Sequence, residues 1–175
     1  MSVVIITGSN GLVGSESVNF FCSKGFDVIG IDNNLRKFFF GSDGSTIWQK
    51  NKLIKNNKNF KSFSIDIRNK NGIEKIFDKY KNKISLIIHS AAQPSHDYGK
   101  NNPFIDFSVN ATGTLNLLEA TKKYCPNSPF IFMSTNKVYG DNPNKLNIVE
   151  TKNRWELSSS DKYYNGIKEN FSIDN

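Results

Sequence analysis

The stretch Thr7-Gly8-Ser9-Asn10-Gly11-Leu12-Val13-Gly14 decides the fold of this 175-residue chain. It follows a run of β-branched residues, 3–7, and it precedes a segment with helical spacing, 12–24. Three glycines at this spacing turn the chain sharply and let the start of a helix face a pyrophosphate. The residues predicted to line this turn are Thr7, Gly8, Asn10, Gly11, Leu12, Val13 and Gly14.

An acid after the second predicted strand supports a dinucleotide site. Asp32 follows the apolar run 26–31 and stands 18 residues after Gly14, where a carboxylate can accept both ribose hydroxyls of an adenosine. The carboxylate would also repel a 2′-phosphate, so we expect NAD rather than NADP, although Arg36 is close enough to meet that phosphate. In the alternative interpretation the glycines only close a loop and Asp32 caps a neighbouring segment.

Strand and helix patterns alternate along residues 1–140. Further strands are predicted over 60–65, 84–88 and 130–133, and further helices near 47–53 and over 71–80 and 103–124. In the last helix we expect core contacts from Phe104, Phe107, Leu115, Leu118 and Ala120. Five strands joined by helices predict an α/β fold with a doubly wound parallel sheet, the Rossmann arrangement. Residues 141–175 show no strong helix or strand pattern.

Charge and composition exclude several classes of function. The formal net charge is +7, but the lysines are interleaved with asparagines and form no long basic run, so no nucleic-acid partner is expected. The first apolar run is too short for a signal peptide or a membrane span, which predicts a cytoplasmic protein without a membrane partner. Cys22 and Cys125 lack metal-ligand spacing, and no metal site is expected.

The two histidines carry different expectations. His89 ends an apolar strand, so a packed and hydrogen-bonded side chain is expected there rather than an acid or a base. His96 follows the turn after that strand, where a substrate contact and a surface role are both open.

Motifs after successive strands resemble those of the extended short-chain dehydrogenase/reductases, which include NAD-dependent nucleotide-sugar epimerases and dehydratases. The glycine pattern is theirs, and Asp66-Ile67 resembles the pair that holds adenine, with Asp66 bonded to its amino group. Ala91-Ala92-Gln93 resembles the turn that lets the nicotinamide ribose and pyrophosphate approach. Asn110 resembles the asparagine that holds the central helix against the active site. Beside the ribose acid, the resemblance adds Asn33 and Arg36 to the cofactor residues.

The segment after the fifth strand resembles the substrate side of these enzymes. The resemblance of Ser134-Thr135-Asn136-Lys137-Val138-Tyr139-Gly140 to the family's Ser-Ser/Thr-x-x-Val-Tyr-Gly implies that Thr135, with Ser134, binds the substrate hydroxyl. Asn136, Lys137 and His96 would lie near the substrate. A 4,6-dehydratase has an acidic pair where Asn136-Lys137 stands, so an epimerase is favoured. In the alternative interpretation the hydroxyls satisfy backbone groups only.

Within the family, the residues resemble those of epimerases that act on CDP-linked sugars. A nucleotide sugar, most of all a CDP-sugar, is therefore the expected substrate, with NAD as the resident cofactor. A 4,6-dehydratase and a non-catalytic NAD-binding module are the alternatives.

One tyrosine-lysine pair has the family's catalytic spacing without its context. By resemblance, a Tyr-x-x-x-Lys pair on one helix supplies a tyrosinate base whose pKa the lysine lowers. Tyr164 and Lys168 have that spacing, but Gly166 lies between them and costs a helix about 1 kcal/mol relative to alanine. We therefore expect the true pair beyond Asn175, an N-terminal fragment that is inactive alone, a sheet incomplete on its C-terminal side, and a homo-oligomeric full-length protein.

Overall fold

The computed structural model describes residues 2–135 and 138–173. The chain divides into two compact units, Met1–Met133 and Ser134–Asn175. The sequence prediction set its boundary after residue 140 instead. Within the described residues no helix is both long and apolar enough to cross a membrane.

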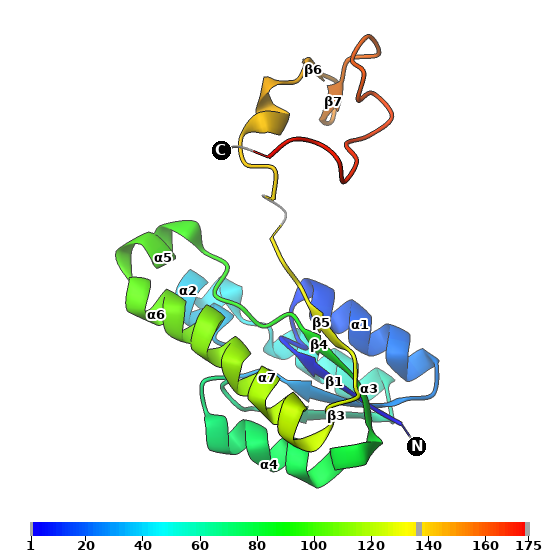
Figure 1. Cartoon of the computed structure of the whole chain (residues 1–175), viewed down its shortest axis with the longest axis vertical. Coiled ribbons are helices and arrows are strands. Elements are labelled where there is room, and N and C mark those ends of the chain that lie inside the picture. The colour runs from blue at the N-terminus through cyan, green and yellow to red at the C-terminus, as the bar shows by residue number, and fades with distance from the viewer. Residues whose placement is uncertain (1, 136–137, 174–175) are drawn as a thin grey trace. The chain divides into compact units, whose positions relative to one another are not determined.

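The first unit is built on a parallel sheet of five strands in the order β3-β2-β1-β4-β5 (Figure 1). The strands are β1 (Val3–Thr7), β2 (Asp27–Ile31), β3 (Phe60–Phe63), β4 (Ile84–His89) and β5 (Phe130–Phe132). All five residues of β1 are buried, as its unbroken apolar run predicts for a central strand covered on both faces. The strand order reverses between β1 and β4, which is where open α/β sheets bind ligands at their carboxyl ends.

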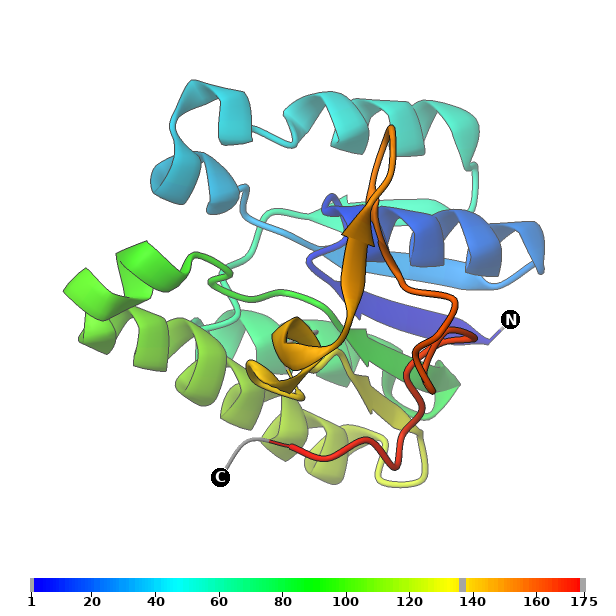
Figure 2. The ribbon, with the colours of Figure 1, turned by 90° about the horizontal axis from the view of Figure 1, so that it is seen from above.

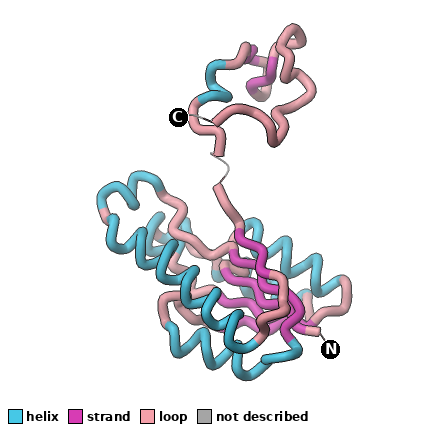
Figure 3. Tube along the Cα trace, in the orientation of Figure 1, coloured by secondary structure: helices cyan, strands magenta, loops and turns pink. Residues whose placement is uncertain are grey.

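Helices cover both faces of this sheet (Figures 2 and 3). The longer helices are α1 (Leu12–Ser23), α3 (Ile47–Asn56), α4 (Lys70–Tyr80) and α7 (Gly113–Tyr124). Helices α1 and α3 pack with one set of strand residues, which includes Val4 and Ile6, and α4 and α7 pack with the alternate set, which includes Val3 and Ile5. Two cores on opposite faces confirm the predicted doubly wound sheet.

Shorter elements connect these layers and lie near the carboxyl ends of the strands. They are α2 (Arg36–Phe40), η1 (Ser42–Gly44), α5 (His96–Asn101), α6 (Pro103–Phe107) and the π-helical turn η3 (Ser108–Thr112), with η2 (Lys81–Lys83) at the opposite end before β4. The segment from α6 through η3 to α7 is the predicted 103–124 helix, with a π turn inside it.

The predicted core face of that segment was largely wrong. Phe104, Phe107, Leu115 and Leu118 are exposed, Phe104 to 90%, whereas Ala120 is buried as predicted. The segment instead buries Val109, Gly113, Leu117 and Ala120, which follow one another at helical spacing. The segment is apolar on two faces, and a π turn shifts the phase of a helix, so the pattern alone did not identify the buried face.

The second unit is more regular than the sequence predicts. It contains η4 (Asn142–Lys145) and an antiparallel pair of short strands, β6 (Ile148–Glu150) and β7 (Trp155–Leu157). The Thr151 N–H donates to the Arg154 carbonyl at 2.9 Å and closes the hairpin. Phe171 is the buried centre of this unit and packs edge-on against Tyr139 and Tyr163.

Candidate functional site

The glycine turn after β1 brings three backbone segments into direct contact. Gly8 has φ +66°, and a Cβ there would lie 2.8 Å from the backbone of Ser90 and Ala91. A Cβ on Gly14 would lie 2.0 Å from the Gly8 carbonyl oxygen, so α1 can start against the turn only without a side chain there. The turn therefore needs glycine at both positions for packing, and at Gly8 for backbone conformation as well.

Asp32 links the end of β2 to the glycine turn. Its Oδ2 accepts a hydrogen bond from the Asn10 N–H at 3.0 Å, and its Oδ1 accepts one from the Asn34 N–H at 2.8 Å. Asn34 has φ +59°, and its side chain accepts from the Thr46 N–H at 2.8 Å. Asp32 thus caps the segment that follows it, and each of its oxygens keeps further acceptor capacity.

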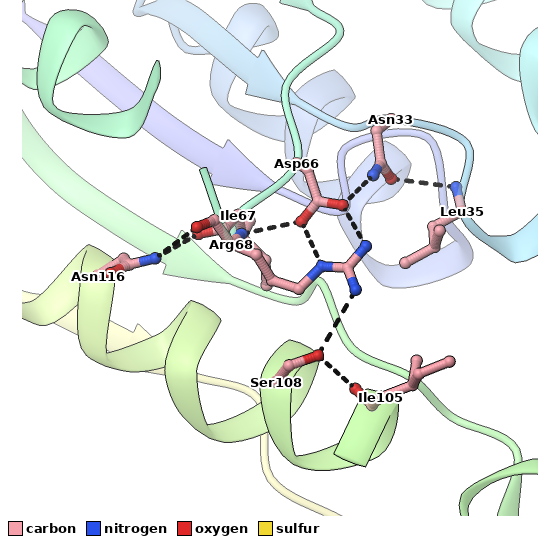
Figure 4. A network of polar contacts seen from close by, with 8 residues as sticks. All are labelled: Asn33, Leu35, Asp66, Ile67, Arg68, Ile105, Ser108 and Asn116. Atoms are coloured by element: carbon pink, nitrogen blue, oxygen red, sulfur yellow. Dashed lines mark hydrogen bonds and ion pairs between the residues drawn. The ribbon is translucent and has the colours of Figure 1, made fainter. Parts of the chain in front are cut away.

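Asp66 is the centre of a polar network after β3 (Figure 4). Its Oδ1 accepts from the backbone N–H and Nε of Arg68 at 2.8 and 3.0 Å, and its Oδ2 accepts from Arg68 Nη2 at 2.7 Å and from Asn33 Nδ2 at 2.9 Å. Burial raises the pKa of Asp66, but the hydrogen bonds and charge of Arg68, with the Asn33 amide, outweigh burial and hold that pKa below its ordinary value. The carboxylate is therefore ionised near neutral pH.

The same network joins β3 to the helices on the other side of the site. Arg68 Nη1 reaches Ser108 Oγ at 3.5 Å, and Asn116 Nδ2 donates to the carbonyls of Ile67 and Arg68 at 3.0 and 3.2 Å. A Cβ on Gly113 would lie 2.5 Å from Ile67 Cδ1, so the Ile67 side chain occupies the space that this glycine leaves. The Ile67 N–H has no partner in the part of the chain that the structure describes.

The turn after β4 is held by residues from β1 and η3. The Ala91 N–H donates to Thr7 Oγ1 at 3.2 Å. The Gln93 N–H donates to Asn110 Oδ1 at 2.8 Å, and Asn110 Nδ2 donates back to the Gln93 carbonyl at 3.2 Å. The Gln93 side-chain amide is buried and forms hydrogen bonds with Ser95 of its own loop and with Asp106 of α6.

His89, the last residue of β4, is buried beneath this turn. Its Nδ1 lies 2.7 Å from Thr7 Oγ1 and its Nε2 lies 2.9 Å from Thr114 Oγ1. Burial lowers the pKa of His89 to about 4, so the ring is neutral at physiological pH. The structure therefore has the packed, hydrogen-bonded histidine that the sequence predicts.

All the predicted cofactor residues lie at one edge of the first unit. They follow β1 (Thr7 to Gly14), β2 (Asp32, Asn33, Arg36), β3 (Asp66, Ile67) and β4 (Ala91, Ala92, Gln93), and Asn110 faces them from η3. The Arg36 guanidinium lies 4.6 Å from the centre of the Phe40 ring in α2. His96 is exposed at the start of α5.

The predicted substrate residues fall elsewhere. Ser134 and Thr135 begin the second unit, where both are exposed, and Asn136 and Lys137 lie outside the described residues. Tyr164 is 54% exposed in a turn, and Gly166 has φ +112°, so Tyr164 and Lys168 do not share a helix face.

Sequence reasoning missed Arg68, Ser108 and Asn116, which organise the network around Asp66. An available signal was the opposite charge two positions after Asp66, directly beyond a strand end. Ser108 lies in η3 and Asn116 lies in α7, where the apolar pattern predicted the wrong buried face. No local signal in the sequence marks either residue.

Comparison with known proteins places these motifs in a family. The family model described as GDP-mannose 4,6 dehydratase matches residues 5–159. CDP-paratose 2-epimerase of Salmonella typhi is 39% identical over 150 residues, which are 85% of this chain and 41% of that protein. UDP-glucuronate 4-epimerase of Thermodesulfobacterium geofontis is 33% identical over 148 residues, 82% of this chain and 42% of the relative.

Solved structures show the same arrangement. UDP-glucose 4-epimerase of Thermotoga maritima, solved with UDP-glucose, has a TM-score of 0.64 at 28% identity and matches 85% of this chain and 41% of its own. The UDP-glucose 4-epimerase of Thermus thermophilus, solved with NAD, has a TM-score of 0.62 at 25% identity, with 90% and 42% covered. The chain thus spans about two fifths of the length of these relatives.

Proposed function

This chain belongs to the GDP-mannose 4,6 dehydratase family, and on that premise we propose that it is the NAD-binding part of a nucleotide-sugar epimerase. One observation carries the proposal. A glycine turn, two carboxylates and a small-residue turn follow four adjacent parallel strands, β1 to β4, at one edge of the sheet. Ligands of open α/β sheets bind in the crevice at that edge.

The residues present fit NAD at each part of the molecule. The glycine turn leaves room for a pyrophosphate where a Cβ on Gly8 or Gly14 would meet backbone, and Asn10 Nδ2 is a buried donor without a partner among the described residues. Asp32 has acceptor capacity for two ribose hydroxyls. The Asp66 carboxylate beside the free Ile67 N–H would offer an acceptor, in exchange for one of its bonds from Arg68 or Asn33, and a donor, which is the complement of the amino group and N1 of adenine. NAD-bound relatives support this assignment.

The chemistry that NAD supplies when bound is reversible hydride acceptance from a sugar carbon, whose return to the opposite face inverts that carbon. In our proposal the chain's own residues hold and orient the reactants. Thr135, with Ser134, binds the hydroxyl on the carbon to be oxidised. The base that takes the hydroxyl proton is a Tyr-x-x-x-Lys pair in the length of the relatives that this chain does not span, since Tyr164 and Lys168 share no helix.

We place a CDP-sugar first among substrates. The 39% identity to a CDP-paratose 2-epimerase exceeds the 33% identity to the UDP-glucuronate epimerase. A 4,6-dehydratase is the second candidate because the matching family model is described as one. Asn136-Lys137, in place of an acidic pair, favours the epimerase. Residues 1–175 alone should turn over neither kind of substrate. Turnover of a CDP-sugar by these residues would contradict the proposal that the catalytic base lies outside them. The cytoplasmic location and the homo-oligomer stay predictions.

Calorimetric titration of residues 1–175 with NAD and NADP tests the cofactor assignment. We expect NAD to bind more tightly, because the Asp32 carboxylate repels a 2′-phosphate. Asp32→Asn should weaken NAD binding about tenfold, because one hydrogen bond to a charged group is lost. The same change should reduce the preference for NAD over NADP. Asp43→Asn, an exposed acid in η1, is the matched control and should change neither constant. Tighter binding of NADP by the unmodified chain would overturn the assignment.

A further inference from the structure

A buried line of hydrogen bonds runs beneath the turn after β4, and its directions can be deduced. Thr114 Oγ1 lies 2.6 Å from the Asn110 carbonyl oxygen, to which only a hydroxyl proton can be donated. Because a hydroxyl has one proton, Thr114 must accept, rather than donate, at the 2.9 Å contact with His89 Nε2. Nε2 therefore carries the proton of the neutral imidazole.

The other side of the ring follows from that tautomer. With its proton on Nε2, His89 presents a bare Nδ1, which accepts from the Thr7 hydroxyl at 2.7 Å. Thr7 Oγ1 in turn accepts the Ala91 N–H at 3.2 Å. The line thus runs in one direction, from the Ala91 amide through Thr7 and His89 to Thr114 and the Asn110 carbonyl.

The line returns to the turn where it began. The Asn110 side chain accepts from the Gln93 N–H at 2.8 Å and donates to the Gln93 carbonyl at 3.2 Å. Both ends of the three-residue turn 91–93 are therefore fixed by one closed set of hydrogen bonds, which we call the circuit. Within the circuit, His89 connects Thr7 of β1 to Thr114 of α7. Thr7 and His89 are 0% and 2% exposed, so water does not substitute for these partners.

We propose that His89 and Thr114 are positioning residues that set the turn 91–93 for the nicotinamide ribose and the adjoining phosphate. This inference rests on the proposed function, the binding of NAD. If His89 only stabilised the sheet as a whole, its loss would weaken the binding of every part of the cofactor equally. The circuit closes only on the turn after β4, whereas the adenosine residues Asp32 and Asp66 have separate partners. Its loss should therefore affect one half of the dinucleotide.

Thr114→Val and Thr121→Val form a matched pair on α7. Each threonine donates to the carbonyl four residues earlier, at 2.6 Å from Thr114 and 2.8 Å from Thr121, but only Thr114 belongs to the circuit. Valine keeps the shape of threonine and removes the hydroxyl. Dissociation constants for NAD and for AMP, measured by calorimetry on residues 1–175, separate the two halves of the cofactor, because AMP lacks both the nicotinamide ribose and the phosphate that adjoins it.

We expect Thr114→Val to weaken NAD binding about fivefold, as the loss of one buried hydrogen bond implies, and to leave AMP binding unchanged. Thr121→Val should change neither constant. If Thr114→Val binds NAD as tightly as Thr121→Val does, or if the binding of NAD and of AMP weakens together, the positioning role is wrong. If the unmodified chain binds neither ligand, the proposed function fails instead.

The tautomer gives a second measurement that does not depend on binding. The chain has two histidines, so nitrogen NMR of the unmodified protein can be assigned by comparison with His89→Asn. We expect a protonated Nε2 and a bare Nδ1 for His89 at neutral pH. The opposite tautomer would contradict the circuit even if Thr114→Val did not fold.

Discussion

Arg68 holds the carboxylate of Asp66, two positions before it, through a pair of side-chain hydrogen bonds, Nε to Oδ1 at 3.0 Å and Nη2 to Oδ2 at 2.7 Å. With the Arg68 N–H and Asn33 Nδ2, four donors surround one carboxylate. The two side chains are 34% and 26% exposed, so water screens the pair only in part. A bidentate, partly buried ion pair of this kind contributes more to the free energy of unfolding than a typical surface pair.

Arg68→Met should lower the free energy of unfolding by about 1 to 2 kcal/mol, because it leaves a partly buried carboxylate with fewer donors. Urea denaturation followed by circular dichroism measures the loss. The control is Lys123→Met, which breaks the 3.1 Å pair with Glu74 on the surface and should cost less than about 0.5 kcal/mol. Equal losses for the two variants would show that the Asp66 pair is no stronger than a surface contact.

Gly14→Ala should be among the most damaging single-methyl changes in the chain. The added Cβ would lie 2.0 Å from the Gly8 carbonyl oxygen, and backbone must move to accommodate it, at a cost of about 3 kcal/mol in the free energy of unfolding. Gly11→Ala is the control, since its Cβ would lie 3.3 Å from the same oxygen and it should cost less than about 1 kcal/mol. Comparable thermal stability of the two variants would contradict the packing argument.

The pH dependence of stability should contain a contribution from His89. Burial lowers its pKa to about 4, below the value near 6.5 of an unfolded histidine, so the unfolded chain binds more protons between these pH values. Its contribution is complete above about pH 6.5 and falls as the pH approaches 4, by about 3 kcal/mol in total. Urea denaturation at a series of pH values across this range should show that the free energy of unfolding changes less steeply with pH in His89→Asn than in the unmodified protein. Identical slopes would show that the ring titrates normally.

The doubly wound parallel sheet and the residues that end its strands could be predicted from the sequence because each is encoded locally. A buried central strand has to be apolar throughout, and the spacing of the glycines in the turn can be recognised without knowledge of tertiary contacts. The stretch from Val3 to Gly14 illustrates both points. The acids Asp32 and Asp66 could be placed because they directly end strands, and parallel strands bring such ends together.

What the sequence could not predict depends on contacts between distant segments. Ser108, in the π turn, was missed because its partner across the site, Arg68, lies 40 positions away. The exposed face of α6 and α7 was assigned to the core because Phe104 and Phe107 have the same apolar character as buried residues. Short strands β6 and β7 leave most of their side chains exposed, so no alternating burial pattern marks them.

The outer edge of β5 should make residues 1–175 prone to association. In the described residues β5 pairs with β4 alone, and its Ile131 is 45% exposed, which leaves an apolar strand edge open to pairing. Ile131→Lys should therefore reduce light scattering at a given protein concentration. Ile54→Lys, which replaces an equally apolar, 48% exposed side chain in α3, should have a smaller effect. If both variants reduce scattering alike, general surface hydrophobicity explains the association better than the strand edge.

Tyr164→Phe should leave turnover nearly unchanged in a protein that joins this chain to the remaining length of its relatives. A base that takes the substrate proton contributes about a hundredfold or more to the rate, and a lysine lowers the pKa of a tyrosine only when the two are close. Here the chain turns at Gly166, with φ +112°, so Tyr164 and Lys168 lack the shared helix face that the pair requires. Thr135→Val is the positive control, because the proposal gives that hydroxyl the substrate contact. A hundredfold loss of turnover in Tyr164→Phe, with NAD binding intact, would make Tyr164 the base after all and would place the catalytic pair within the second unit.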